Sequence, residues 1–226
     1  MCSSDLAAEK PRSDIWFWAG DSKPAERIVH PGTAGMPKGK HLGGGVSFSR
    51  DGSALTLSVQ DPPEAELQAI LPDEKVSLDI WHWNEGQLQT QQQKRGRRDQ
   101  SRSAVFSLRD HTLKVTGDDT VEQVRPIRPD ASLGLGSDEQ PYEKATQWDG
   151  RYADVYLVDI QKGVRTKVLE RLRTSPTSSP NGRYLIWFGP DYHWWTMDTA
   201  TQQKRDLTAS LAVPFHQFDD DHPEPD

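Results

Sequence analysis

The chain has 226 residues, of which 34% are hydrophobic and 27% are charged, and its formal net charge is −7. An acidic chain is a poor general binder of nucleic acid, and no apolar run approaches the about 18 residues that a membrane span needs. The single cysteine, Cys2, excludes both an internal disulfide framework and a structural zinc site. The mean hydropathy of −0.79 suits many short, half-exposed strands in one large all-β domain or two ordinary ones.

The first half of the chain predicts short strands separated by turns. A strand over 14–18 is followed by a partner strand over 26–30, and residues 31–45, rich in glycine and proline, form a loop. Further strands are predicted over 46–49, 54–59, 79–83, 104–108 and 112–116. We expect at most one short helix, within 63–71 or within the polar insertion 87–103.

The second half contains the clearest strands. Residues 153–159 and 164–169 predict one antiparallel hairpin, and 183–198 predict a second one that starts at an Asn-Gly turn. Residues 140–150 are predicted as a loop. The other strands predicted in this half, all weaker, cover 121–127, 131–136, 175–179 and 204–208.

Two short patterns recur along the chain. An Asp-aliphatic-aromatic pattern starts at Asp14, Asp79 and Asp154, with a looser copy at His193. Turns of the type Ser-x-Asp/Asn-Gly occupy 49–52 and 179–182, and we interpret 148–150 as a variant. About 40 residues per four strands is typical of β-propeller blades. We therefore predict an all-β partial propeller of three to four four-stranded blades, the first a half blade, with a β-sandwich as the main alternative.

The two ends of the chain lead us to expect a fragment of a longer protein. Residues 2–6 resemble a translated sequencing adapter, residues 1–10 have no apolar signal-peptide core, and 219–226 contain no closing strand or helix. The predicted division is a disordered or artefactual terminus over 1–13, the partial propeller over 14–212 and a truncated inter-blade loop over 213–226. In an open ring, aromatic faces at both ends stay uncovered: Trp16, Phe17 and Trp18 at one end, and Trp187, Trp194 and Trp195 at the other.

Part of the chain resembles a known family. Residues 148–159 and 179–188, together with 78–83 and 213–215, resemble the propeller domain of bacterial prolyl-oligopeptidase-like serine peptidases. The blade pattern is shared with TolB-like propellers, which carry no peptidase. The resemblance implies a propeller that caps an α/β-hydrolase domain and filters peptide substrates by size, in a periplasmic or secreted parent. That hydrolase domain, expected beyond residue 226, and the peptide substrate are the implied partners.

No catalytic, cofactor-binding or metal-ligating residue is predicted. The chain has no Gly-x-Ser-x-Gly nucleophile elbow, and residues 45–49 match only its first half, so Ser47 is interpreted as structural. The acidic run 219–224 lacks the glycine and the spacing of a calcium loop, and we interpret it as a solvated loop. The basic run 94–98 has no interleaved aromatic residues and is interpreted as a solvated face.

Tryptophan residues recur in pairs within or beside the predicted strands. The pairs are Trp16/Trp18, Trp81/Trp83 and Trp194/Trp195. At i, i+2 spacing the first two pairs each point to one sheet face, which predicts packing between blades. His82 and His193, beside these aromatic residues, are interpreted as structural and need hydrogen-bond partners if buried.

Two functions therefore remain open at this stage. The first is the substrate-gating, non-catalytic propeller of a prolyl-oligopeptidase-type peptidase. The second is a TolB-like propeller that binds a protein or peptide partner with no enzyme attached. A sugar-binding or glycosidase propeller is a weaker third, because it needs convergent carboxylates that the spacing does not identify.

Overall fold

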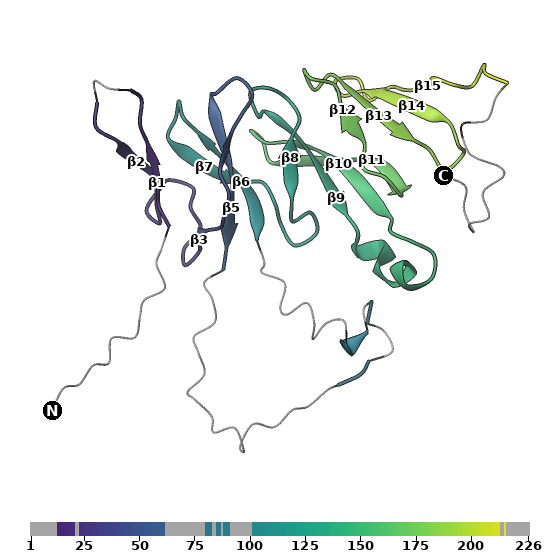
Figure 1. The fold of residues 1–226 in the computed structure, drawn as a ribbon, viewed down its shortest axis with the longest axis horizontal. Coiled ribbons are helices and arrows are strands. Elements are labelled where there is room, and N and C mark those ends of the chain that lie inside the picture. The colour runs from purple at the N-terminus through teal and green to yellow at the C-terminus, as the bar shows by residue number, and fades with distance from the viewer. Residues whose placement is uncertain are drawn as a thin grey trace.

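The computed structural model describes residues 13–20, 23–61, 80–82, 85–86, 88–90, 101–212 and 215. Almost all of its regular structure is antiparallel β-sheet, in four sheets that follow one another in chain order (Figure 1). We name them sheets A to D. The predicted all-β class is confirmed.

The four sheets have the following strands. Sheet A pairs β1 (Ile15–Phe17) with β2 (Glu26–Val29). Sheet B has the order β3 (His41–Leu42), β5 (Ala54–Gln60), β6 (Arg102–Ser107) and β7 (Thr112–Val115), and β4 (Ser47–Phe48) also pairs with β5. Sheet C contains β8 (Val124–Pro126), β9 (Leu133–Asp138), β10 (Ala153–Asp159) and β11 (Val164–Leu172). Sheet D contains β12 (Thr177–Ser178), β13 (Tyr184–Phe188), β14 (Trp194–Asp198) and β15 (Lys204–Asp206).

Sheets B, C and D are each a meander of four strand positions, since β3 and β4 lie one after the other along the same edge of β5. The second strand of each meander pairs with the third. In the three sheets, Thr56 faces Val105, Leu135 faces Leu157 and Ile186 faces Thr196. Such four-stranded meanders, repeated side by side, are the blades of a β-propeller. The chain is a partial β-propeller of one two-stranded and three four-stranded blades, as predicted.

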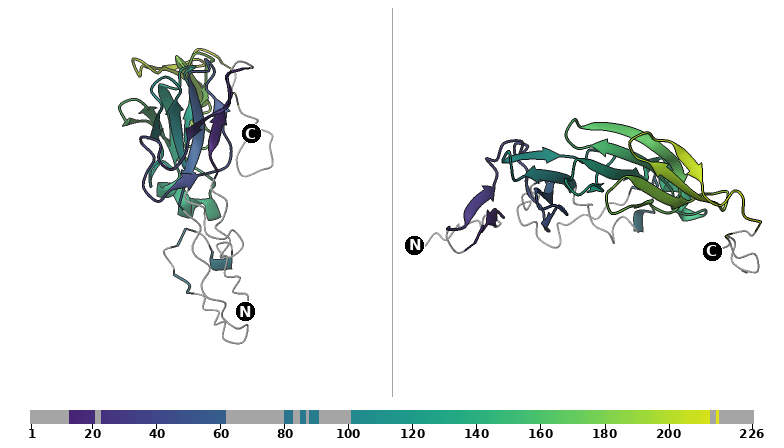
Figure 2. Two further views of the ribbon diagram at one scale, coloured as in Figure 1. Left: turned by 90° about the vertical axis from the view of Figure 1, so that its left-hand side faces the viewer. Right: turned by 90° about the horizontal axis from the view of Figure 1, so that it is seen from above.

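Apolar side chains from consecutive sheets form the core, which is divided into layers between the sheets. Between A and B, Ile28 and Val29 join a cluster with Leu55, Leu57 and Phe106. Between C and D, residues of both sheets pack together: Leu135, Val155, Leu157 and Leu169 with Leu185, Trp187 and Met197. Alternate residues along each strand supply these contacts, as the period of two requires. Seen from above, the sheets form an open row, with A and D at opposite ends (Figure 2).

Three sequence predictions about the elements are wrong. The predicted loop 31–45 contains the short strand β3, which pairs with the C-terminal end of β5. The predicted loop 140–150 contains a 3₁₀ helix, η1 (Gln140–Gln147), which starts where the Asp138 carboxylate accepts the Gln140 N–H at 3.0 Å, with Pro141 in its first turn. It buries no residue, so it leaves no apolar periodicity in the sequence. In the predicted strand 79–83, the described residues 80–82 form no strand and are exposed. The third strand of sheet B is β6 instead. Residues 63–71 and 91–100 lie outside the described residues.

Candidate functional site

In sheets B and D the strand pairs β4–β5 and β12–β13 are joined by the same turn, built by the same hydrogen bonds. In sheet B the Ser49 hydroxyl donates to Asp51 Oδ1 at 2.8 Å and accepts the Ala54 N–H at 2.9 Å. In sheet D the Ser179 hydroxyl donates to Asn181 Oδ1 at 2.8 Å and accepts an N–H at 3.0 Å, from the first residue of β13. Each turn thus ties its side chains to its own backbone, and its geometry is fixed before any ligand arrives.

The third member of this set is 128–131 in sheet C, and the predicted variant 148–150 is wrong. Asp130 Oδ1 accepts the Ser132 N–H at 3.1 Å, as Asp51 Oδ1 accepts the Ser53 N–H at 2.9 Å. Ala131 takes a φ of +52° where the other two turns have glycine at +73° and +68°. The sequence pattern does not identify this turn, because Ala131 replaces the glycine and Arg128 replaces the serine. Residues 148–150 instead follow η1 and precede β10.

The three turns meet at one end of the sheets. The Asp51 N–H donates to the Pro129 carbonyl at 3.2 Å, which joins the turns of sheets B and C. The Arg50 guanidinium donates to the Pro180 carbonyl, which joins the turns of sheets B and D. A Cβ on Gly182 would lie 2.6 Å from the Ile127 carbonyl oxygen, so the turns of sheets C and D are in direct contact. We call this arrangement the turn cluster.

A hollow of about 640 Å³ opens over the turn cluster. Charged side chains of both signs line it, namely Asp51, Asp130, Asp198, Arg128 and Arg183. The remaining lining residues are Pro129, Asn181, Ala200 and Thr201. Hydrogen bonds from the backbone and hydroxyl of Ser53 lower the pKa of Asp51. The pKa of Asp198 is lowered chiefly by the backbone N–H groups of Ala200 and Thr201. Both carboxylates are therefore ionised at neutral pH, and the hollow offers fixed charges to a polar ligand.

A second set of equivalent contacts explains the pattern at Asp14, Asp154 and His193, whereas Asp79 lies outside the described residues. Asp14 lies 2.7 Å from Arg27, which faces Trp16, and Asp154 lies 2.9 Å from Lys167, which faces Tyr156. In each case the charged partner faces the residue two positions after the Asp, so the pair runs diagonally between the strands. In sheet D the equivalent diagonal pair is His193 Nδ1 and Asp206 Oδ2, 2.8 Å apart, and Asp206 faces Trp195. β1 and β2 therefore hold the places of the third and fourth strands of a blade. These pairs join the third and fourth strands of a blade.

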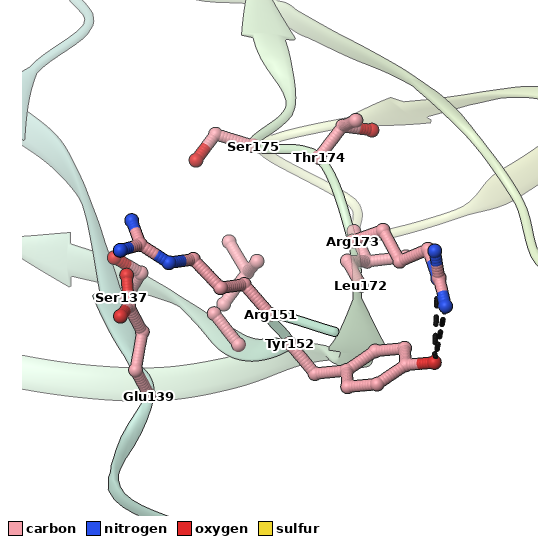
Figure 3. Close-up of a pocket in the computed structure, with 10 residues that line it drawn as sticks. Ser137, Glu139, Arg151, Tyr152, Leu172, Arg173, Thr174 and Ser175 are labelled. Carbon is pink, nitrogen blue, oxygen red and sulfur yellow. Dashed lines mark hydrogen bonds between the residues drawn. The ribbon is translucent and has the colours of Figure 1, made fainter. Parts of the chain in front are cut away.

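A smaller hollow, of about 100 Å³, lies at the opposite end of sheet C (Figure 3). Its lining includes Val155 and Leu172, and Figure 3 shows the Arg151 side chain extending toward Ser137 and Glu139. Beside it, the Tyr152 hydroxyl accepts a hydrogen bond from the Arg173 guanidinium at 2.9 Å. The guanidinium carbons of Arg171 and Arg173 lie 4.7 and 5.1 Å from the centre of the Tyr152 ring. This network joins the ends of β10 and β11, and we assign it a structural role.

The structure places the other candidate residues apart from one another. The Ser47 hydroxyl, on exposed β4, lies 2.6 Å from the Thr56 hydroxyl, a contact that supplies no base. The runs 94–98 and 219–224 lie outside the described residues. Within the described ranges, no three His, Cys, Asp or Glu side chains are placed to hold a metal ion. No helix in that part of the chain has the length and apolarity that crossing a membrane requires.

The predicted roles of the tryptophan residues are partly wrong. Trp16 and Trp18, predicted to pack between blades, are 61% and 60% exposed, because Ile15 and Phe17 face sheet B instead. Trp187, predicted to be uncovered, is buried between sheets C and D and stacks on Trp195 with ring centroids 6.5 Å apart. The described Trp81 is exposed, and Trp83 lies outside the described residues.

Comparisons with known proteins give remote structural likenesses. No family model and no curated protein matches the chain. TolB from Acinetobacter baumannii is similar with a TM-score of 0.35 and 16% identity, over 81% of this chain and 35% of that one. An oligogalacturonate lyase in complex with manganese is similar with a TM-score of 0.42 and 14% identity, over 81% of this chain and 44% of that one. A structure from a study of two prolyl endopeptidases is similar with a TM-score of 0.46 and 14% identity, over 88% of this chain and 26% of that one.

The chain thus spans between about a third and a half of the length of the first solved structures that it resembles. All these scores lie below 0.5, so the fold is assigned from the strand order and from the packing between sheets. By these criteria the chain is a partial β-propeller.

Proposed function

We propose that this chain is the non-catalytic propeller portion of a prolyl-oligopeptidase-type serine peptidase and that it receives peptide substrate at the turn cluster. The observation that carries the proposal is the hollow of about 640 Å³ where equivalent turns of three consecutive sheets meet. The sequence resemblance at 148–159 and 179–188 supports the choice of family. A TolB-like binding propeller is the alternative, since the Ser-x-Asp/Asn-Gly turn occurs in both groups.

The hollow suits an extended polypeptide because its polar groups are held ready for a ligand. Asp51 and Asp130 each use Oδ1 for their own turn, and neither Oδ2 has a hydrogen-bond partner among the described residues. The exposed Arg128 guanidinium likewise makes no hydrogen bond within that part of the chain. The turn hydrogen bonds hold the Asp51 and Asp130 carboxylates in place, so these two groups lose little entropy on binding, whereas the exposed Arg128 side chain becomes ordered only when it pairs with a ligand.

Binding at the hollow is tested with three unstructured decapeptides, one acidic, one basic and one neutral. We expect the Arg128→Ala variant to bind the acidic peptide about tenfold more weakly, because it loses a charge-assisted hydrogen bond worth about 1.4 kcal/mol. Isothermal titration calorimetry measures the change. Arg109→Ala is the matched control, since Arg109 is exposed on the turn between β6 and β7, outside the hollow. Equal affinities of the two variants would contradict the proposed site.

Catalysis is tested separately. We expect the chain of residues 1–226 to turn over neither peptide nor ester substrates, because its sequence has no Gly-x-Ser-x-Gly elbow. The assay measures release of a chromogenic leaving group with and without a serine-directed covalent inhibitor. Inhibitor-sensitive turnover by the purified chain would overturn the non-catalytic assignment.

The two candidate families are separated by the coding sequence beyond residue 226. A peptidase parent requires Gly-x-Ser-x-Gly there, followed by an Asp and then a His in the chain order of α/β-hydrolases. A coding sequence with further blade repeats and no elbow would favour the TolB-like alternative.

A further inference from the structure

The face of sheet D that points away from sheet C carries a continuous set of apolar side chains. The rings of Phe188 and Trp194 face each other across β13 and β14 with centroids 5.4 Å apart, and Tyr192 packs edge-on against Phe188 at 6.3 Å. Ile186 and Tyr184 extend the same face along β13 and are exposed. An exposed apolar face with clustered aromatic residues is typical of an interaction surface.

The equivalent face of sheet C shows what covers such a surface. Counted from the equivalent turns, Leu135 holds the place of Ile186, and counted from the equivalent residues Asp154 and His193, Val155 holds the place of Trp194. Leu135 and Val155 are 7% and 2% exposed, whereas Ile186 and Trp194 are 38% and 37% exposed. The difference arises because sheet D packs on sheet C through Leu185, Trp187 and Met197. The side chains that fit this face are therefore those of another blade.

Sheet A presents the complementary face at the other end of the row. Asp14 and His193 hold equivalent places in their diagonal pairs, so Trp16 corresponds to Trp195 and Trp18 corresponds to Met197. Trp195 and Met197 are side chains with which sheet D packs on sheet C. In sheet A the two tryptophan side chains have no such partner among the described residues and are mostly exposed.

We infer that two copies of the chain of residues 1–226 associate head to tail, with sheet A of one copy packed on the open face of sheet D of the other. The contact repeats, between copies, the packing that joins sheets C and D within one copy. It buries Trp16 and Trp18 of one copy against the Phe188 and Trp194 face of the other. Because the two faces differ, each added copy leaves one open face of each kind. The inference does not depend on the proposed function.

Sedimentation velocity over about 1–200 μM tests the inference. We expect the average mass of the unmodified chain to rise with concentration. Trp16→Arg blocks the sheet A face, and Trp194→Arg blocks the sheet D face, so each variant alone should remain monomeric. An equimolar mixture should form a 1:1 dimer and stop there, because one intact face of each kind remains. Trp148→Arg, at a residue 74% exposed beside η1 and on neither face, is the matched control and should associate like the unmodified chain.

Each alternative outcome overturns the inference. A monomer at every concentration shows that a second copy does not cover the face. Association of Trp16→Arg alone shows that two sheet D faces pack on each other. Failure of the mixture to dimerise shows that the faces are not complementary. Circular dichroism checks the fold of both variants, and Trp18→Arg and Ile186→Lys replace any variant that fails it.

Discussion

Replacing Asp154 with alanine is expected to lower the free energy of unfolding by about 3–6 kcal/mol. The Asp154 side chain is nearly fully buried and accepts hydrogen bonds from the Tyr142 hydroxyl at 2.7 Å, the Arg171 N–H at 3.1 Å and the Lys167 ammonium at 2.9 Å. A hydrogen bond to a charged group contributes about 1.5–3 kcal/mol. We count only the first two, because the half-exposed Lys167 ammonium returns to water at little cost. Urea unfolding at pH 7 measures the change.

The pH dependence separates the charge of Asp154 from its packing. Burial raises the pKa of Asp154, but hydrogen bonds from Lys167, Tyr142 and the Arg171 backbone outweigh it and lower the pKa overall. A carboxyl with a lowered pKa in the folded state stabilises above its unfolded pKa of about 3.9 and loses that contribution as the pH falls through the folded value. Asp154→Asn should therefore differ most from the unmodified chain at pH 6–7 and least near pH 3. A difference that stays constant with pH would contradict the ionised pairing.

Replacing Gly182 with alanine is expected to lower the free energy of unfolding by about 3 kcal/mol. Gly182 has a φ of +68°, and a non-glycine residue in this region costs about 1–2 kcal/mol. The added Cβ would also lie 2.6 Å from the Ile127 carbonyl oxygen of the neighbouring turn, which is backbone that cannot move aside alone. Overpacking of this kind costs about 1–3 kcal/mol more.

Gly52→Ala is the matched control for the cost of the close contact with the neighbouring turn. Gly52 holds the same place in the turn of sheet B with a φ of +73°, and no atom lies within 4 Å of its Cβ position. Ala131 already occupies the place in sheet C, so the conformation itself admits alanine. We expect Gly52→Ala to cost only about 1 kcal/mol. Equal losses in the two variants, compared by thermal and urea unfolding, would show that the turns of sheets C and D do not touch.

The sequence predicts the strands best where turn residues and alternation agree. Residues 153–169 and 183–198 form the predicted hairpins because a Gly-containing turn lies between or before β-branched and aromatic runs. The turn at 128–131 was not predicted because Ala131 adopts a positive φ, a conformation that sequence patterns predict only for glycine. A search for Asp or Asn three residues before the second strand, without requiring glycine, finds all three turns.

Which sheet faces are covered could not be predicted from residue spacing. The i, i+2 rule puts Trp16 and Trp18 on one face but does not say whether another sheet lies over it. In β13 both faces are apolar, so Trp187 and Ile186 look alike in the sequence, although one is buried and the other exposed. The hollow was missed for a related reason: its lining comes from turns far apart in the chain, and only the packing of consecutive sheets brings them together.

Amide hydrogen exchange at Asp51 tests most directly whether the sheets meet through their equivalent turns. The Asp51 N–H donates to the Pro129 carbonyl of the neighbouring sheet, whereas the N–H of Asn181, at the equivalent place in sheet D, has no acceptor among the described residues. In residue-resolved NMR exchange under native conditions, we expect Asp51 to exchange at least about tenfold more slowly than Asn181 after correction for intrinsic rates. Equal, fast exchange of the two amides would show that the turns of sheets B and C are not in contact and would contradict the side-by-side packing of the blades.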